Sequence, residues 1–398
     1  MKSVEVHVRL KGLTNSPASL PKSGGVAVRA ASDPAARETQ SLRVARRVLA
    51  LAESSWDDPR YGGSGLVKKG RLMAEVRIAT FNLENFDETA AAERPSLAER
   101  IQLMRPQIVR LRADVVCFQE VNGQERPNQP RALLALTELL TSTNLAGAHL
   151  ASTQTADNEV FDERNLVVAT TFPVLGVQQL RNDLVATLSY RRLTANPPDG
   201  AAVTIGIERP ILHVQLDLPS GSRLHVVNVH LKSKIPTDIP GQKIDGFTWR
   251  TADAWAEGSF ISSMKRMSQA LEVRRLVDQI LDADTAAQIV VAGDFNAAPD
   301  EVPVMAIRGD VENTGNPDLV GRVLVPIEHT IPAPARYTLY HQGHGEMLDH
   351  MLITRNLLAH YRGSEIHNEI LHDESAAFAI DRKYPESDHA PSVATFDF

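Results

Sequence analysis

The chain has 398 residues, of which 43% are hydrophobic and 23% charged, an ordinary balance for a soluble globular protein. It contains no run near the ~18 apolar residues that span a bilayer, and its single cysteine, Cys117, excludes an internal disulfide. The formal net charge of -7 is uneven, because residues 1–75 carry 13 Lys and Arg but only 7 Asp and Glu. The acidic remainder is a poor partner for long nucleic acid unless divalent cations and a local basic loop offset its charge.

Residues 1–72 differ in composition from the rest of the chain, with Gly-rich and Pro-containing stretches and one predicted helical segment from Ala36 to Ser54. The first residues lack the continuous apolar core of a secretory signal, so we expect a cytoplasmic protein. Residues 1–72 are predicted to be an N-terminal extension that is largely disordered, or an artefact of the chosen translation start. Met73 directly precedes the first clear strand, which is consistent with a true start there and with one folded domain over residues 73–398.

From residue 75 onward, short apolar segments alternate with amphipathic ones, a pattern typical of an α/β protein. Pro106 is expected to kink the first of the helices or to begin a second one. Strands are predicted at residues 76–81, 113–119, 165–170, 184–190, 211–216, 224–230, 289–292, 348–354 and 392–398. Helices are predicted at residues 97–111, 131–140 and 262–281.

Polar side chains stand at the ends of several predicted strands. Asp294 and Asn296 follow the buried run 288–292 and, being two residues apart on a strand, point to the same side. Each such residue alone also suits a turn, a cap or a buried, hydrogen-bonded histidine. Their shared position at strand ends, where α/β folds assemble sites, favours a functional cluster. The other residues of this kind are Asn82, Glu120, Asn228, His230, Asp349, Asp388 and His389.

The chemistry of these residue types indicates a metal-assisted reaction. Carboxylates and carboxamides such as Glu120, Asn82 and Asp388 are hard oxygen ligands, which suit Mg²⁺ or Mn²⁺ rather than zinc. Histidines beside carboxylates suit general acid–base chemistry near neutral pH. Together they predict metal-assisted hydrolysis of a phosphate ester.

The order of these motifs resembles that of the endonuclease/exonuclease/phosphatase superfamily, which includes deoxyribonuclease I. The motifs are the segment 81–86 (FNLENF), Gln119-Glu120, Asn228-Val229-His230, 293–296 (GDFN), Leu348-Asp349-His350 and Ser387-Asp388-His389. The resemblance covers about residues 75–398 and implies a deoxyribonuclease I-like fold. That fold is a four-layer α/β sandwich, with two packed mixed β-sheets flanked by helices. The segment His-Leu-Lys-Ser-Lys after residue 229 resembles bacterial nuclease-like members more than it resembles lipid phosphodiesterases.

The resemblance also implies roles for individual residues. A divalent metal, Mg²⁺ or Mn²⁺, would be held by Asn82, Glu120 and Asp388. Asp294 and Asn296 would position or deprotonate the attacking water. The catalytic residues would further include His389, oriented by Asp349, and His230, with Glu163 as its acidic partner. Asn228, Arg209 and Lys232 would contact the substrate. The sequence leaves open which of these groups is the base.

The connection after His230 is the variable element that bears on substrate. It carries Lys232, Lys234, Lys243 and Arg250 together with two tryptophans, Trp249 and Trp255. These residues either grip phosphates and stack on bases, or anchor the connection to the core. We predict a phosphodiesterase that acts on nucleic acid as an endonuclease or exonuclease, without stable membrane association. The alternatives are a phosphatase or a sphingomyelinase-like lipid phosphodiesterase with the same site, and an inactive binding or scaffold protein.

Overall fold

The computed structural model describes residues 74–89, 93–379 and 383–398. The extension predicted over 1–72, its helix from Ala36 to Ser54 and the start at Met73 lie outside these ranges and stay predictions. Within the described ranges, no helix is long and apolar enough to cross a membrane.

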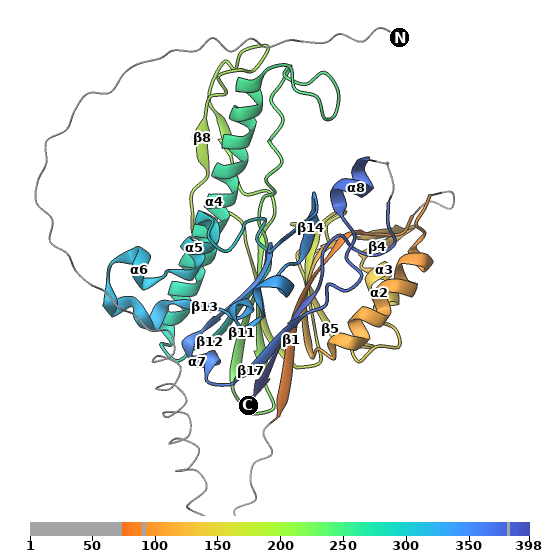
Figure 1. The fold of residues 1–398 in the computed structure, drawn as a ribbon, viewed down its shortest axis with the longest axis vertical. Helices are drawn as coiled ribbons and strands as arrows, with labels where there is room; N and C mark the ends of the chain where they lie inside the picture. The colour runs from red at the N-terminus through yellow and green to blue at the C-terminus, as the bar shows by residue number, and fades with distance from the viewer. Residues whose placement is uncertain (1–73, 90–92, 380–382) are drawn as a thin grey trace, which may run out of the picture. The chain divides into compact units, whose positions relative to one another are not determined.

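Two six-stranded mixed sheets pack face to face (Figure 1). The pairs β1–β2 and β11–β12 are parallel, so each pair brings two carboxyl ends to the same edge of its sheet. The first sheet has the order β17 (Tyr361–Ile366), β18 (Ser392–Asp397), β1 (Glu75–Phe86), β2 (Val115–Val121), β6 (Asn165–Thr170) and β5 (His149–Ser152). The second has the order β13 (Leu324–Pro326), β16 (Asp349–Thr354), β12 (Gln288–Asp294), β11 (Arg223–His230), β10 (Ile211–Asp217) and β7 (Val174–Leu180).

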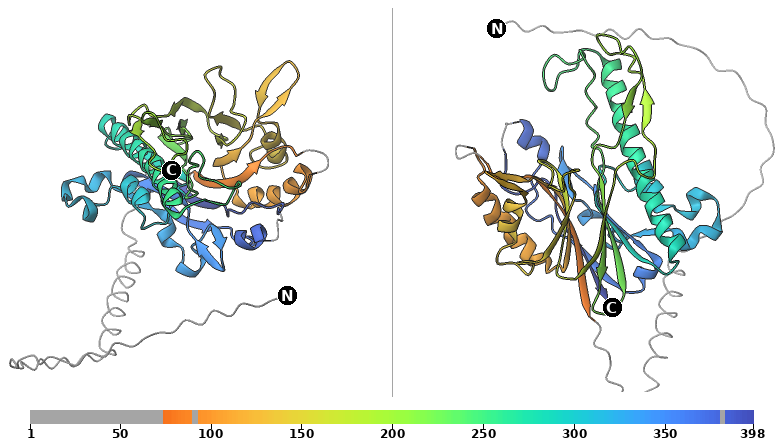
Figure 2. Two further views of the ribbon diagram at one scale, coloured as in Figure 1. Left: turned by 90° about the horizontal axis from the view of Figure 1, so that it is seen from above. Right: turned by 180° about the vertical axis from the view of Figure 1, so that it is seen from behind.

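Helices cover the outer face of each sheet, which gives the four layers that the sequence predicts (Figure 2). Helices α2 and α3 pack on the first sheet, and α4 and α5 pack on the second. The helices are α2 (Leu97–Leu111), α3 (Leu134–Leu140), α4 (Ala252–Ala283), α5 (Val302–Arg308), α6 (Val311–Thr314), α7 (Arg355–Leu358) and α8 (Glu374–Ala379). Shorter elements are the hairpins β3 (Gln124–Arg126) with β4 (Gln129–Ala132), β8 (Leu188–Tyr190) with β9 (Val203–Ile205), and β14 (Leu339–His341) with β15 (His344–Glu346), and the 3₁₀ turns η1 (Pro317–Arg322), η2 (Ile327–Thr330) and η3 (Ala333–Ala335).

The centre of the sandwich is a layer of β-branched side chains from both sheets. Ile78 and Val115 of the first sheet share one buried cluster with Val214, Val226 and Val290 of the second. Branched side chains fit the pleated, buried face of a sheet well, and this explains why the strands were visible in the sequence. The cluster holds the two sheets together along their length.

Helix α2 runs without interruption through Pro106, so the alternative of two helices is wrong. Its start is fixed by a capping box, in which the Ser96 hydroxyl accepts from the Glu99 N–H and the Glu99 carboxylate accepts from the Ser96 N–H. The strand predicted at 184–190 is shorter than expected and comprises only β8. The backbone N–H groups that precede β8 donate to the buried carboxylate of Glu272 instead of to a neighbouring strand.

Helix α4 begins ten residues earlier than predicted, at Ala252 rather than at 262. Thr251 caps it through a hydrogen bond from the Ala254 N–H to its hydroxyl. The amino-terminal half of α4, the β8–β9 hairpin and residues 232–250 form a projection that rises beyond the ends of the sheets, here called the arm (Figure 2).

The arm has an apolar core of its own, which includes Ile205, Ile239 and Ile261. The buried carboxylate of Glu257 on α4 accepts hydrogen bonds from the Leu193 and Thr194 N–H groups, which fixes the hairpin to the helix. Of the two predicted alternatives for the tryptophans, anchoring is confirmed for Trp249, which packs against the arm core. Trp255 lies on α4 and is 51% exposed.

Candidate active site

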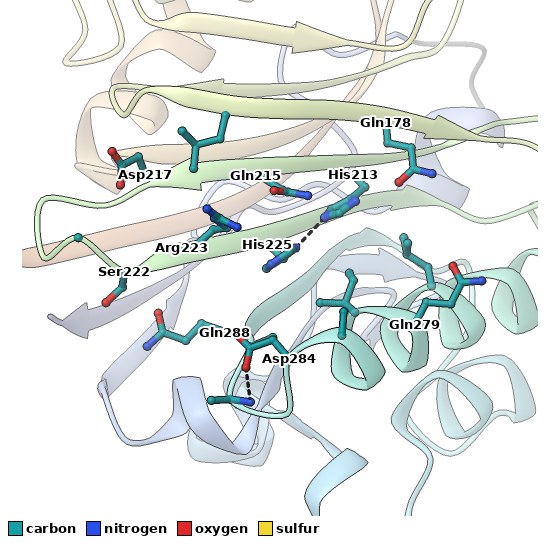
Figure 3. A pocket seen from close by; sticks show the side chains of 17 residues that line it. Gln178, His213, Gln215, Asp217, Ser222, Arg223, His225, Gln279, Asp284 and Gln288 are labelled. Carbon is teal, nitrogen blue, oxygen red and sulfur yellow. Dashed lines mark hydrogen bonds between the residues drawn. The ribbon is translucent and has the colours of Figure 1, made fainter.

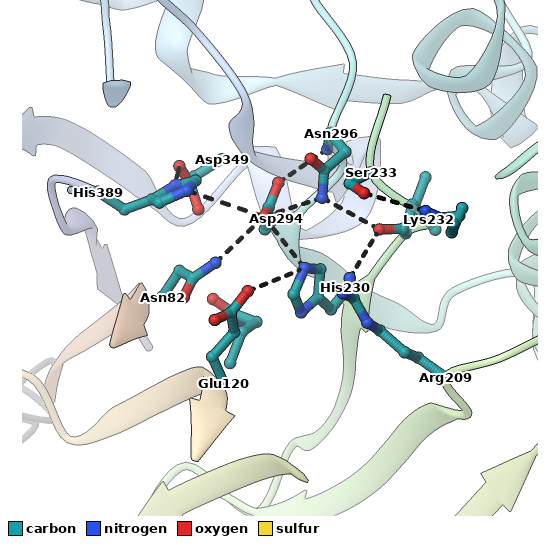
Figure 4. A network of polar contacts seen from close by, with 12 residues as sticks. Asn82, Glu120, Arg209, His230, Lys232, Ser233, Asp294, Asn296, Asp349 and His389 are labelled. Atoms are coloured by element: carbon teal, nitrogen blue, oxygen red, sulfur yellow. Dashed lines mark hydrogen bonds and ion pairs between the residues drawn. The ribbon is translucent and has the colours of Figure 1, made fainter. Parts of the chain in front are cut away.

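Several of the polar residues predicted from strand ends meet at one edge of the sandwich (Figure 4). His230 lies opposite Asp294 in the β11–β12 ladder, and Asp294 lies opposite Asp349 in the β12–β16 ladder. The Asn82 amide from the first sheet donates to the Asp294 carboxylate of the second at 3.1 Å. The site is therefore assembled across both sheets.

Asp294 accepts more hydrogen bonds than the other carboxylates described at this edge. It is 2% exposed and accepts hydrogen bonds from the Asn296 backbone N–H at 2.8 Å and the Asn296 amide at 3.0 Å. The preceding Gly293 has φ +144°, and a Cβ there would lie 1.9 Å from the Val229 carbonyl oxygen. Only glycine permits this close approach of β12 to β11, which sets the direction of the Asp294 side chain.

Burial makes Asp294 a weaker acid than usual. Burial raises its pKa to about 7, and the charges of Asp349 and Glu120 add to this effect while His389 opposes it. A carboxylate with a pKa near the working pH is suited to accept a proton from water.

His389 and Asp349 form a buried dyad. His389 Nδ1 lies 2.7 Å from Asp349 Oδ2, so Nε2 faces the Asp294 carboxylate at 4.0 Å. Burial alone would lower the pKa of His389, but the charges of Asp349 and Asp388 raise it well above its usual value. The imidazole is thus held as a cation in this arrangement. Ser387, which the sequence motif contains but the prediction left without a role, donates to the Asn82 carbonyl and accepts from the His389 N–H.

His230, in contrast to His389, has a neutral ring. Its Nε2 lies 3.3 Å from Asp294 Oδ2 and 3.6 Å from Glu120 Oε1, and its buried Nδ1 has no hydrogen-bond partner. Burial and the positive charge of Arg209 hold its pKa well below the usual value, so the ring is neutral. The edge therefore contains one charged and one neutral histidine on either side of one carboxylate.

Four residues near this edge have left-handed backbone conformations: Glu84 and Asn85 of β1, Glu120 of β2, and Asn296 just beyond the end of β12. The φ angles are 57° at Glu120, 51° at Glu84, 47° at Asn85 and 47° at Asn296. Non-glycine residues rarely adopt this region, and such strain concentrates at functional sites. The Asn85 N–H donates to Glu120 Oε2 at 2.9 Å, and the Asp388 N–H donates to Glu84 Oε2 at 3.1 Å. Backbone N–H groups thus hold the carboxylates of Glu120 and Glu84.

Cationic side chains border His230. Arg209 donates to the Leu231 carbonyl at 3.2 Å, and burial lowers its pKa although Glu120 and Asp294 oppose that effect. Burial lowers the pKa of Lys232 to about 8, and the nearby Arg209 adds to the effect. The exposed Arg164 also acts on Arg209 and His230 electrostatically. The sequence prediction passed over Arg164, although it follows Glu163 directly.

Two predicted site residues are placed differently. Asn228 has no exposed surface, and its amide donates to the Phe118 and Val167 carbonyls, so it links the sheets beneath the site and does not face a substrate. Glu163 is exposed and contacts neither ring nitrogen of His230, because Nε2 faces other carboxylates and Nδ1 has no partner. Short motifs locate a residue in the chain but do not fix the direction of its side chain.

Comparison with known proteins now identifies the family. A model described as the Endonuclease/Exonuclease/phosphatase family matches residues 79–389. The chain belongs to this family. The endonuclease/exonuclease/phosphatase family protein of Bacteroides thetaiotaomicron is 13% identical, with a TM-score of 0.50 over 82% of this chain and 96% of that one. The endonuclease/exonuclease/phosphatase of Bacteroides vulgatus is 18% identical, with a TM-score of 0.49 over 81% of this chain and 98% of that one. No curated protein matches. At these identities the structural likeness shows the fold alone.

The edge of this family member has donors suited to a divalent metal. Asp294, Asp349 and His389 have ligand atoms within 4.8 Å of one another. Asp349 Oδ1 and Asp388 Oδ1 are buried oxygens without a hydrogen-bond partner. Buried carboxylate oxygens are costly unless they are paired or coordinate a cation, and carboxylate oxygen is the ligand that Mg²⁺ prefers. The carboxylate oxygens of this edge therefore fit a divalent cation, whereas the His389 ring, when protonated, has no lone pair for one.

The crowding of carboxylates gives a prediction for stability. Burial raises the pKa of Glu84 to about 8, that of Asp294 to about 7 and that of Asp388 to about 6. Because the folded state holds these protons more tightly than the unfolded state, their contribution is fully present below about pH 4 and is lost as pH rises to about 8. In EDTA, the thermal midpoint is expected to fall between about pH 5 and about pH 8. Added Mg²⁺ is expected to raise it more at the higher pH. A midpoint in EDTA that rises with pH would contradict this prediction.

A separate cavity lies away from this edge (Figure 3). It has a volume of about 840 Å³ and lies between the outer face of β7, β10 and β11 and the carboxyl-terminal half of α4. Its stacked histidines His213 and His225 contact each other at 3.0 Å, and burial lowers the pKa of both rings. None of the predicted site residues lines it, so its size alone does not make it the reaction site.

Proposed function

We propose that this family member is a Mg²⁺- or Mn²⁺-dependent phosphodiesterase that hydrolyses nucleic acid as an endonuclease or exonuclease. The observation that carries the proposal is the position of two histidines beside the Asp294 carboxylate, with His389 Nε2 at 4.0 Å and His230 Nε2 at 3.3 Å. Burial lowers the pKa of His230, and neighbouring carboxylates raise the pKa of His389, so the geometry favours one neutral and one charged ring. Attack on a phosphodiester needs an activated water and neutralised phosphoryl oxygens. This arrangement provides a proton acceptor and a cation side by side.

In the proposed reaction Asp294 accepts the proton of the attacking water. Asn296 donates to both carboxylate oxygens of Asp294, through its N–H to Oδ1 and through its amide to Oδ2. The Asn82 amide also donates to Oδ2. These donors hold the carboxylate in one orientation, and the hydrogen bond from the Asn296 N–H partly offsets the rise in pKa that burial causes. Neutral His230, at 3.3 Å, adds a polar contact without adding a positive charge that would lower the basicity of Asp294.

His389 and the arginine and lysine beside His230 would act on the phosphate. The Nε2–H of the imidazolium would donate to a phosphoryl oxygen, with Asp349 holding the ring through Nδ1. Arg209 and Lys232 border the same edge and would bind further oxygens of the substrate. A metal held by Asn82, Glu120 and Asp388, with Glu84 beside them, would neutralise charge on the phosphoryl oxygens and the leaving oxygen.

A lipid phosphodiester is the second candidate substrate, because the arm exposes apolar side chains. Leu193 is 82% exposed, Phe247 80% and Ile244 61%. Aliphatic and aromatic side chains of this kind can enter the interfacial region of a membrane. Dependence on salt separates the candidates, since binding to nucleic acid weakens steeply as salt rises.

Hydrolysis assays test the proposal. Plasmid DNA, single-stranded oligonucleotide, RNA and bis-p-nitrophenyl phosphate would be offered with Mg²⁺, with Mn²⁺ and with EDTA. We expect cation-dependent cleavage of a nucleic acid, abolished in Glu120→Ala because that carboxylate belongs to the proposed metal site. Glu125→Ala is the matched control, because Glu125 is exposed and pairs only with Arg131 among the ion pairs of the described residues. Full activity in Glu120→Ala, or in EDTA, would contradict the proposal.

A further inference from the structure

A second cavity lies at the base of the arm, close to the proposed reaction site. It has a volume of about 380 Å³ and lies between β9 and α4. Aliphatic side chains of Ile205 and Ile261 form part of its wall, together with Arg181, Arg192 and Lys265. Its size falls within the range of cavities that bind small organic groups.

The charges of this cavity do not balance. Arg192 pairs with Asp199 at 2.7 Å, and Asp238 pairs with Lys243 at 2.7 Å. Lys265 pairs with Glu208. Arg181 is the exception, since its guanidinium forms no ion pair with any carboxylate in the described part of the chain. Arg181 is therefore a cation of the cavity lining that no carboxylate of the described residues neutralises, and a guanidinium of this kind can bind a phosphate through two parallel hydrogen bonds.

The position of Arg181 is fixed from two sides. Its Nε donates to the Ile207 carbonyl at 2.9 Å, which leaves the two terminal nitrogens of the guanidinium for a ligand. The backbone beyond it is held by the buried carboxylate of Glu272, which accepts from the N–H groups of Asn182 and Asp183. The Asn182 side chain in turn accepts from the Ile207 N–H at 2.8 Å. A preorganised guanidinium binds an anion at a lower entropic cost than a mobile one.

Helix α4 connects this cavity to the reaction site. Gln269 is 1% exposed, and its amide donates to the carbonyls of Arg209 and His230 and accepts from the Lys232 N–H. Lys265 lies one helical turn before Gln269 and lines the cavity. Glu208 and Lys265, which both line the cavity, act electrostatically on Lys232 beside His230. The cavity therefore adjoins the cationic border of the proposed reaction site.

We infer that the cavity is a subsite for a flanking phosphate of the polynucleotide substrate, bound by Arg181 with Lys265 beside it. This inference rests on the proposed function. It adds that the substrate is a polynucleotide chain, bound also through a phosphate next to the one that is cleaved. The aliphatic wall offers a surface for the sugar or base that accompanies the phosphate. A small diester reaches the reaction site without occupying the subsite.

Binding of a fluorescent single-stranded oligonucleotide in EDTA tests the subsite without turnover. Arg181→Ala is expected to weaken binding about 5- to 20-fold and to reduce the slope of log K against log salt by about 0.7, the value for one single-strand phosphate contact. Arg191→Ala is the matched control, because Arg191 is likewise an exposed arginine, lies in the connection between β8 and β9, and does not line the cavity. Glu208→Gln is expected to tighten binding, since it releases Lys265 from its ion pair. A loss of folding would not tighten binding.

Measurements of turnover, compared with those of binding, distinguish failure of the proposed nuclease function from failure of the phosphate subsite. The loss of kcat/KM in Arg181→Ala is expected to be several-fold larger for an oligonucleotide than for bis-p-nitrophenyl phosphate, and to reside in KM. If wild-type protein binds the oligonucleotide but cleaves no phosphodiester, the proposed function is wrong and the subsite is still supported. Equal affinities of Arg181→Ala and Arg191→Ala, or no binding by the wild type, would overturn the subsite.

Discussion

Asp294→Asn protein is expected to hydrolyse bis-p-nitrophenyl phosphate with a kcat about 10²- to 10⁴-fold below that of the wild type. The amide has nearly the same shape as the carboxylate but cannot accept a proton from water at neutral pH. It also removes one negative charge from a crowded group in which burial raises the pKa of Asp294 to about 7. The thermal midpoint is therefore expected to stay level or to rise while activity is lost.

Asp318→Asn is the matched control for that substitution, because Asp318 is exposed and lies in the 3₁₀ turn η1. It should leave both kcat and the thermal midpoint unchanged. If Asp294→Asn lowers the midpoint by several degrees along with the rate, the carboxylate has a structural role and the assignment of the base is wrong.

Asp349→Asn protein is expected to show a loss of kcat on the order of 10⁴-fold, the size seen when the carboxylate that orients a catalytic histidine becomes an amide. The Asp349 carboxylate accepts from His389 Nδ1 at 2.7 Å, whereas an amide can present a donor there and select the other tautomer. The change also lowers the pKa of His389, because Asp349 is the largest of the charges that raise it. The alkaline limb of the pH–rate profile should therefore move to lower pH.

A double mutant distinguishes a dyad from two independent groups. His389→Ala with Asp349→Asn should be no slower than His389→Ala alone, since groups that act as a unit do not add. Losses that multiply would show that Asp349 acts on something other than His389.

The sequence predicted much of the site because of a simple property of sheets. Parallel neighbouring strands end at a common edge, so residues at those ends become neighbours even when they are far apart in the chain. Asp294 and His230 meet in this way, in register on β12 and β11. Conspicuous apolar strands made their ends easy to locate, and the family resemblance then predicted the residues from elsewhere that join them.

Other features depend on contacts that have no local signal. The carboxylates of Glu272 and Glu257 look like ordinary helical surface residues, yet each binds backbone N–H groups of the segment that leads into the arm. Asn228 faces the opposite sheet rather than the substrate because carbonyls of β2 and β6 lie within its reach. The partners of these side chains depend on which elements pack together in the fold, and no single stretch of sequence specifies that packing.

The division of the site between two sheets gives the interior of the sandwich a part in catalysis. Only two direct hydrogen bonds between the proposed reacting groups cross from one sheet to the other among the described residues, Asn82 to Asp294 and His389 to Asp349. The separation of the sheets is set by side chains such as Ile78 and Val226, far from any reacting atom. These aliphatic residues keep the proposed metal ligands of the first sheet at a fixed distance from the proposed proton acceptor on the second. The proposed chemistry therefore depends on the volume of the core as well as on the polar residues.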